Sequence, residues 1–121
     1  NSALRIITGR EAQGFAEHDW RDLAMPGSAA AIYMGIRAAR FLQGRLLMHG
    51  ALADTPVTIV ENVSRPDQRV IPTTISSLPE ALDNSVVTGP AVLLYGISPR
   101  EAISASLTLR EPAQLQSEGA L

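Results

Sequence analysis

The sequence has no cysteine and only two histidines among its 121 residues. The lack of cysteine excludes disulfides and thiolate metal sites, and the scarcity of histidine argues against a histidine-rich metal centre. No apolar run approaches the roughly 18–20 residues that are needed to span a bilayer, and the N-terminus lacks the pattern of a signal peptide. We therefore expect a cytoplasmic protein with no metal and no membrane partner.

An excess of basic charge is also missing. The formal net charge is -2, apolar residues make up 45% of the chain and charged residues make up 18%. This balance is normal for one globular domain with a hydrophobic core. Because nucleic acids and anionic membranes usually require a basic surface, we expect no nucleic-acid partner.

The common catalytic signatures do not occur in the sequence. It contains no G-x-G-x-x-G or Walker loop for phosphates and no G-x-S-x-G nucleophile elbow. We interpret His18 as an ordinary loop residue and His49 as a residue that ends a helix. The sequence therefore assigns a catalytic role to no residue.

Apolar strands and helices alternate along the chain. Three runs are continuously apolar, which is typical of strands buried on both faces: 29–34, 56–60 and 91–95. The runs 4–8 and 69–74 indicate two more strands. This order predicts an α/β domain with a mainly parallel sheet.

The clearest helix is predicted over residues 36–49, where apolar residues recur three and four apart. Gly50 follows it at the position where a left-handed residue often ends a helix. Asp19 is expected to cap a short helix over 20–24, and Ser77 is expected to cap another.

Other stretches have little pattern. Residues 10–28 are polar and mixed apart from the short helix, and 83–89 is expected to be a loop. We expect the domain to occupy residues 1–100. Residues 101–121 are expected to finish a last strand around 105–109, to form a flexible tail, or both.

The end of the strand over 29–34 is the most suggestive place for a site. Ligands of open α/β sheets bind beyond the carboxyl ends of the strands. Met34 offers a soft apolar contact, and Gly35 permits the close approach of a ligand. Core packing by Met34 and a turn at Gly35 would explain the same residues, so both interpretations stay open.

Several short motifs follow one another between residues 3 and 100. They are Leu4-Arg5-Ile6-Ile7-Thr8-Gly9, Asp19-Trp20, Ala31-Ile32-Tyr33-Met34-Gly35, Gly50-x-x-Ala53-Asp54-Thr55-Pro56-Val57, Val60-Glu61-Asn62, Pro66-Asp67-Gln68-Arg69-Val70 and Gly89-Pro90-Ala91-Val92-Leu93-Leu94-Tyr95-Gly96. In this order and spacing they resemble the second half of uroporphyrinogen-III C-methyltransferase, the methylase of siroheme synthase and a member of the tetrapyrrole methylase family. The set is specific, although each piece alone is weak.

The resemblance implies a fold and an activity. The fold is the C-terminal α/β domain of a tetrapyrrole methylase, a mixed sheet of about five strands flanked by helices. The activity is the methylation of uroporphyrinogen III to precorrin-2 by S-adenosylmethionine, for siroheme or cobalamin biosynthesis. The resemblance also implies that the enzyme is a symmetric homodimer. The family's N-terminal methylase domain, with its glycine-rich loop, is not among the 121 residues, so we expect the chain alone to be inactive.

The resemblance also assigns cofactor contacts. Met34 corresponds to a methionine that contacts S-adenosylmethionine, with Tyr33 and Gly35 beside it. Val63 corresponds to a main-chain contact, which requires its side chain to point away, and Ala91 lies near the adenine. We expect the strands that lead to Met34 and Val63 to be neighbours in the sheet, with their carboxyl ends on the same side.

Two arginines are candidates for binding the substrate. Arg37 and Arg40 are candidates for contacts to the substrate carboxylates, although a solvated helix face or a subunit contact is the commoner explanation for such arginines. The family commonly has Thr-Gly-His where this chain has Thr8-Gly9-Arg10. A histidine role therefore cannot be carried over to Arg10.

Three alternatives differ from this interpretation in class. The chain could serve only as a dimerisation module of such an enzyme, or it could belong to a methyltransferase for a later precorrin. An unrelated domain that senses a small ligand is the third, and the ordered set of motifs argues against it.

Overall fold

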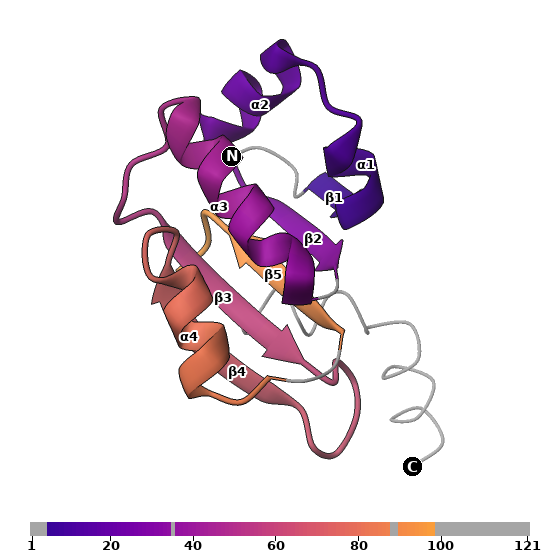
Figure 1. Cartoon of the computed structure of the whole chain (residues 1–121). Coiled ribbons are helices and arrows are strands. Elements are labelled where there is room, and N and C mark those ends of the chain that lie inside the picture. The colour runs from indigo at the N-terminus through magenta and orange to yellow at the C-terminus, as the bar shows by residue number, and fades with distance from the viewer. Residues whose placement is uncertain (1–4, 35, 88–89, 99–121) are drawn as a thin grey trace.

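The computed structural model describes residues 5–34, 36–87 and 90–98. Within these residues, five strands form one mixed sheet in the order β1-β2-β5-β3-β4 (Figure 1). The elements are β1 (Arg5–Thr8), α1 (Gly9–Gln13), α2 (Glu17–Ala24), β2 (Ala30–Met34), the 3-10 helix η1 (Ile36–Ala38), α3 (Ala39–Met48), β3 (Pro56–Glu61), β4 (Arg69–Thr74), α4 (Leu78–Asn84) and β5 (Ala91–Tyr95).

The strand directions confirm one expectation and correct another. The mixed five-stranded sheet that the resemblance implies is confirmed. The mainly parallel sheet is wrong, because β1 and β2 are parallel while the pairs β2–β5, β5–β3 and β3–β4 are antiparallel. The central strand β5 is buried along its whole length. A strand covered on both faces is apolar in either direction, so the pattern could not reveal how it runs.

All four α-helices contribute to a core on one face of the sheet. Figure 1 shows α3 and α4 crossing in front of the strands. Alternate strand residues such as Ile32, Ile59 and Leu93 join this core, as the two-residue period of a strand requires. A smaller cluster lies on the opposite face and consists of Ala31, Val60, Val92, Leu94 and Ile97.

The end of α3 is as predicted. Gly50 has φ +102°, its N–H donates to the Leu47 carbonyl at 3.1 Å, and the Ala51 N–H donates to the Leu46 carbonyl at 2.9 Å. These are the two bonds of a Schellman motif. His49 ends the helix, and its ring stacks on Trp20 with 6.3 Å between the centroids.

The N-terminal helices differ from the predictions. The helix α1 was not predicted, although Thr8 and Glu11 form its capping box: the Glu11 N–H donates to Thr8 Oγ1 at 3.0 Å and the Thr8 N–H to Glu11 Oε1 at 2.8 Å. The helix α2 begins earlier than expected, so His18 lies in a helix rather than a loop. Asp19 does not occupy the N-cap position, and its carboxylate instead accepts the N–H of Ala16 at 3.0 Å.

The helix α4 and the segment after β5 are the two predicted features in the C-terminal part of the chain. Ser77 occupies the cap position of α4, but its side chain makes no capping hydrogen bond, and the helix runs to Asn84, into the predicted loop. The strand expected around 105–109 and the rest of 101–121 lie outside the described residues. None of the helices among the described residues is long and apolar enough to cross a membrane.

Burial of Tyr95 should make the free energy of unfolding depend on pH in the alkaline range. Its side chain is 2% exposed, and burial raises the pKa of the phenol above 10.0, against a smaller lowering by a hydrogen bond with Thr55. Above pH 10 the unfolded chain therefore releases a proton that the folded chain retains, so stability is full below that pH and falls as the pH rises. The slope is at most about 1.4 kcal/mol per pH unit.

Denaturant titrations between about pH 9 and about pH 11 test this expectation, because the ordinary pKa of tyrosine is about 10. The chain has neither lysine nor cysteine, so Tyr33 and Tyr95 are its only side chains with ordinary pKa values in this window. Tyr95→Phe should flatten the decline, whereas Tyr33→Phe should leave it unchanged. Equal declines in both variants would contradict the assignment to Tyr95.

Candidate cofactor and substrate site

Three strand ends meet at one edge of the sheet, which we call the site edge. The strands β2 and β3 end here at Met34 and Glu61, and β5 begins here at Ala91, which pairs with both of them. Because β5 opposes both strands, β2 and β3 have their carboxyl ends on the same side, as expected. The two strands are not neighbours, however, since β5 lies between them.

A hollow of about 310 Å³ lies at the site edge, and we call it the first hollow. Four of the five residues predicted to contact a cofactor line it together, and the fifth, Gly35, lies outside the described residues. Their role as cofactor contacts stays a prediction. The lining consists of Tyr33, Met34, Asn62, Val63, Arg65, Pro90, Ala91 and Val92.

Tyr33 and Met34 face opposite sides of the sheet. Met34 is 7% exposed and packs in the helix-covered core, whereas Tyr33 is 39% exposed. A Cβ atom added to Gly9 would lie 3.2 Å from the Met34 Cβ, so the start of α1 packs closely against Met34. Both interpretations of Met34 therefore apply, because the side chain belongs to the core and also borders the hollow.

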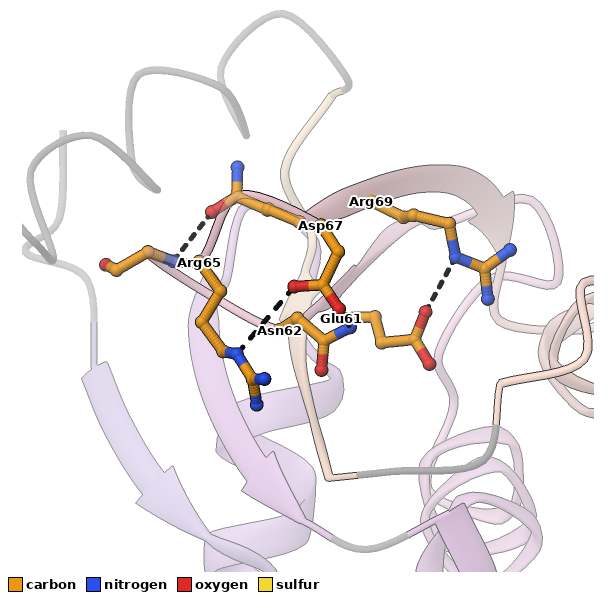
Figure 2. Close-up of polar contacts among 7 residues, drawn as sticks. Glu61, Asn62, Arg65, Asp67 and Arg69 are labelled. Atoms are coloured by element: carbon orange, nitrogen blue, oxygen red, sulfur yellow. Dashed lines mark hydrogen bonds and ion pairs between the residues drawn. The ribbon is translucent and has the colours of Figure 1, made fainter.

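The loop between β3 and β4 is held by its own polar contacts (Figure 2). The Asn62 amide donates to Asp67 Oδ2 at 3.1 Å, and the Ser64 N–H donates to Gln68 Oε1 at 2.9 Å. Asn62 and Ser64 both adopt positive φ angles, +56° and +69°. These contacts fix the backbone on both sides of Val63.

Val63 has the orientation that a main-chain contact requires. Its side chain packs against the apolar cluster on the face opposite the helices. Within the described part of the chain, neither its N–H nor its carbonyl group makes a hydrogen bond, so both remain available at the first hollow. A valine at this position is therefore compatible with a ligand bound through the main chain.

A half-buried ion pair joins the two strands of the same hairpin next to this loop. The Arg69 Nε lies 2.6 Å from Glu61 Oε1, and the Glu61 side chain is 8% exposed (Figure 2). Sequence reasoning missed this pair and also the place of Arg65 in the first hollow. The predicted strands put Glu61 and Arg69 near facing ends of a hairpin, which was the available signal for the pair.

The two arginines proposed for the substrate do not line the first hollow. Arg37 is exposed on η1. The Arg40 Nη2 lies 3.9 Å from Asp83 Oδ2, and both side chains are largely exposed. The structure thus places both on the helix-covered side of the sheet, and a substrate role for either stays a prediction.

A second hollow of about 470 Å³ adjoins the first through Tyr33 and Met34, which line both. Its other lining residues come from the end of β1, from α1 and from η1: Thr8, Gly9, Arg10, Gln13 and Ala38. Among the described residues, no group of three or more histidine, aspartate or glutamate side chains could hold a metal ion.

Comparison with known proteins identifies relatives of this chain by sequence. The chain is 39% identical over 94 residues to a siroheme synthase of Pseudoalteromonas translucida, covering 78% of this chain and 20% of the relative. A siroheme synthase of Azotobacter vinelandii is 33% identical over 94 residues with the same coverage. The chain is a homologue of the methylase region of siroheme synthases. It spans about a fifth of the length of these relatives.

Solved structures show the same fold. The chain matches a cobalt precorrin-4 methyltransferase with a TM-score of 0.67 at 21% identity, covering 79% of this chain and 41% of the other. It matches the uroporphyrin-III C-methyltransferase of Thermus thermophilus with a TM-score of 0.60 at 24% identity, covering 78% and 41%. A further structure of that enzyme, with a TM-score of 0.59 and the same identity and coverage, contains S-adenosylhomocysteine. No family model matches the sequence.

Proposed function

We propose that this homologue of siroheme synthases supplies one wall of the S-adenosylmethionine site in a uroporphyrinogen-III C-methyltransferase. The observation that carries the proposal is the first hollow, where Tyr33, Met34, Val63 and Ala91 meet at the carboxyl ends of β2 and β3. The resemblance assigns cofactor contacts to these residues, although they are up to 58 positions apart in sequence (91 − 33 = 58). A Thermus thermophilus relative in structure binds the demethylated product of this cofactor.

The residues of the first hollow fit such a cofactor. Its lining is mostly apolar, which suits an adenine ring and the carbons beside a sulfonium. Met34 contributes a polarisable thioether. The main-chain groups of Val63, which have no hydrogen-bond partner among the described residues, supply a donor and an acceptor for polar atoms of the ligand.

When bound, S-adenosylmethionine supplies a methyl group to an electron-rich pyrrole carbon of the substrate. The residues of this chain therefore need to position the methyl group against the substrate carbon and to exclude water from the site. None of them needs to act as the nucleophile. Met34 is held by the core and by Gly9, so it offers a fixed apolar contact. Asn62 and Asp67 hold the loop that presents the Val63 main chain.

Binding of S-adenosylhomocysteine to the full chain tests the proposal by NMR. We expect amide shifts at Tyr33, Val63 and Ala91. We expect none in the hollow at the opposite edge of the sheet, which Met25, Ser28, Leu52 and Gly96 help to line. Shifts at that opposite edge alone, or no shifts at saturating ligand, would argue against the proposed function.

Met34→Ala should raise the dissociation constant of S-adenosylhomocysteine by about tenfold, which corresponds to about 1.4 kcal/mol. The variant loses the thioether contact at the first hollow, and it also loses stability because Met34 is buried. Met48→Ala is the matched control, since Met48 is 66% exposed on α3 and lines neither hollow. Denaturation curves establish that both variants are folded at the temperature of the titration, and equal affinities for the two variants would contradict the role of Met34.

A later precorrin as substrate is the second candidate. It stays a candidate because a cobalt precorrin-4 methyltransferase shares the fold of this chain, while the identity of 39% to a siroheme synthase supports uroporphyrinogen III. Turnover with each substrate by an enzyme that contains this chain distinguishes them. A cytoplasmic location and a symmetric homodimer stay predictions.

A further inference from the structure

The second hollow has no role in the proposed cofactor site, yet it shares a wall with it. Tyr33 and Met34 line both hollows. A molecule seated in the second hollow would therefore lie beside whatever the first hollow binds. With a volume of about 470 Å³, the second hollow is the larger of the two.

The second hollow offers cationic and neutral hydrogen-bond donors and no acidic side chain. Its lining residues with polar side chains are Thr8, Arg10, Gln13 and Tyr33. The nearby Glu11 is not part of the lining, and its carboxylate accepts the Thr8 N–H at 2.8 Å. The lining therefore suits an anion rather than a cation.

Arg10 is exposed and has no ion pair or side-chain hydrogen bond within the described residues, which sets it apart from several other arginines. Arg69 pairs with Glu61 and Arg65 lies near Asp67. The position of Arg10 is nevertheless defined, because the capping box fixes the start of α1 and Gly9 packs against Met34. The structure thus holds an uncompensated guanidinium close to Met34.

All ten basic residues of the chain are arginines, and it has no lysine. A guanidinium can bind a carboxylate through two parallel hydrogen bonds, which an ammonium cannot do. We propose that the second hollow is a carboxylate subsite for the tetrapyrrole substrate and that Arg10 is its anion-binding residue. This inference rests on the proposed function, because it places the substrate beside the methyl donor.

The test is a titration of uroporphyrin III with the full chain, followed by the fluorescence anisotropy of the porphyrin. Uroporphyrin III is the stable oxidised form of the proposed substrate and keeps its carboxylates. Arg10→Gln should raise the dissociation constant about tenfold, since hydrogen bonds to charged groups are worth more than neutral ones. Arg10→Lys should have a smaller effect, because it keeps the charge and loses the planar fork.

Arg21→Gln is the matched control, because it removes the same charge. Arg21 is exposed on α2 and lines neither hollow. It should leave the affinity unchanged. Equal effects of Arg10→Gln and Arg21→Gln would overturn the subsite, and so would a failure of the unsubstituted chain to bind uroporphyrin III. S-adenosylhomocysteine binding, measured by NMR on the same variants, separates the two ideas: if it persists at the first hollow while the subsite fails, the proposed function stands.

Discussion

Gly96→Ala is expected to lower the free energy of unfolding by at least about 3 kcal/mol. Gly96 follows β5 and has φ +77°, a conformation that costs an alanine about 1–2 kcal/mol. A Cβ atom at this position would lie 2.0 Å from the Ser28 carbonyl oxygen, which belongs to the backbone and cannot rotate away. The Gly96 N–H also donates to the Pro56 carbonyl at 2.8 Å, so moving the chain to relieve the clash would strain that bond.

Gly44→Ala provides a control with the opposite expected sign. Gly44 lies within α3, and an added Cβ atom would meet nothing within 4 Å. Alanine is favoured over glycine in a helix interior by about 0.5–1 kcal/mol, so this variant should be slightly more stable than the unsubstituted chain. Urea denaturation of both variants measures the difference, and a Gly96→Ala midpoint equal to that of the unsubstituted chain would contradict the close approach to Ser28.

The strands were largely predictable because burial on both faces leaves a plain signal. The runs 29–34, 56–60 and 91–95 all fall on strands of the structure. Their directions were not predictable. The last strand, β5, lies between β2 and β3, and nothing in its apolar sequence indicates this position or its direction. The resemblance supplied the mixed sheet that the pattern had missed.

The short N-terminal helices were the weakest part of the prediction. The helix α1 has five residues and only one of them, Ala12, is buried, so it shows no apolar period. The Thr8 and Glu11 pair was a readable signal for its start, because a capping box needs only these two side chains. The sequence predicts Asp19 as the N-cap of α2 because an aspartate just before an apolar residue is typical of a helix start. In the structure Asp19 lies inside the helix, and its carboxylate accepts the N–H of Ala16.

The candidate site, too, could be predicted only in part from the sequence. The motifs named Tyr33, Met34, Val63 and Ala91, and the structure brings all four to the first hollow. Arg10 could not be found as a candidate from sequence, because its significance depends on the contact between Gly9 and Met34 and on the absence of an acidic neighbour in the second hollow. Such features arise from tertiary packing and have no local pattern.

The largest functional effect is expected when a polypeptide of only these 121 residues is assayed for methyl transfer. The first hollow is open, and the chain corresponds to 41% of the solved uroporphyrin-III C-methyltransferase. Contacts that position the methyl group from the other side must then come from elsewhere. Positioning can supply about 7–11 kcal/mol of the barrier, so we expect turnover close to the uncatalysed rate.

A chimera makes this expectation informative. The siroheme synthase of Pseudoalteromonas translucida is 39% identical to this chain over 94 residues, so that region can be replaced by the corresponding residues of this chain. Transfer of labelled methyl groups from S-adenosylmethionine to uroporphyrinogen III is then measured for the isolated chain and the chimera. We expect activity in the chimera and a reduced activity at limiting S-adenosylmethionine in the same chimera with Met34→Ala, because that change removes a contact at the first hollow and leaves the opposing wall intact. If the isolated chain transferred methyl groups as fast as the chimera, all the groups that position the reactants would have to lie within these 121 residues, and the one-wall description of the first hollow would be wrong.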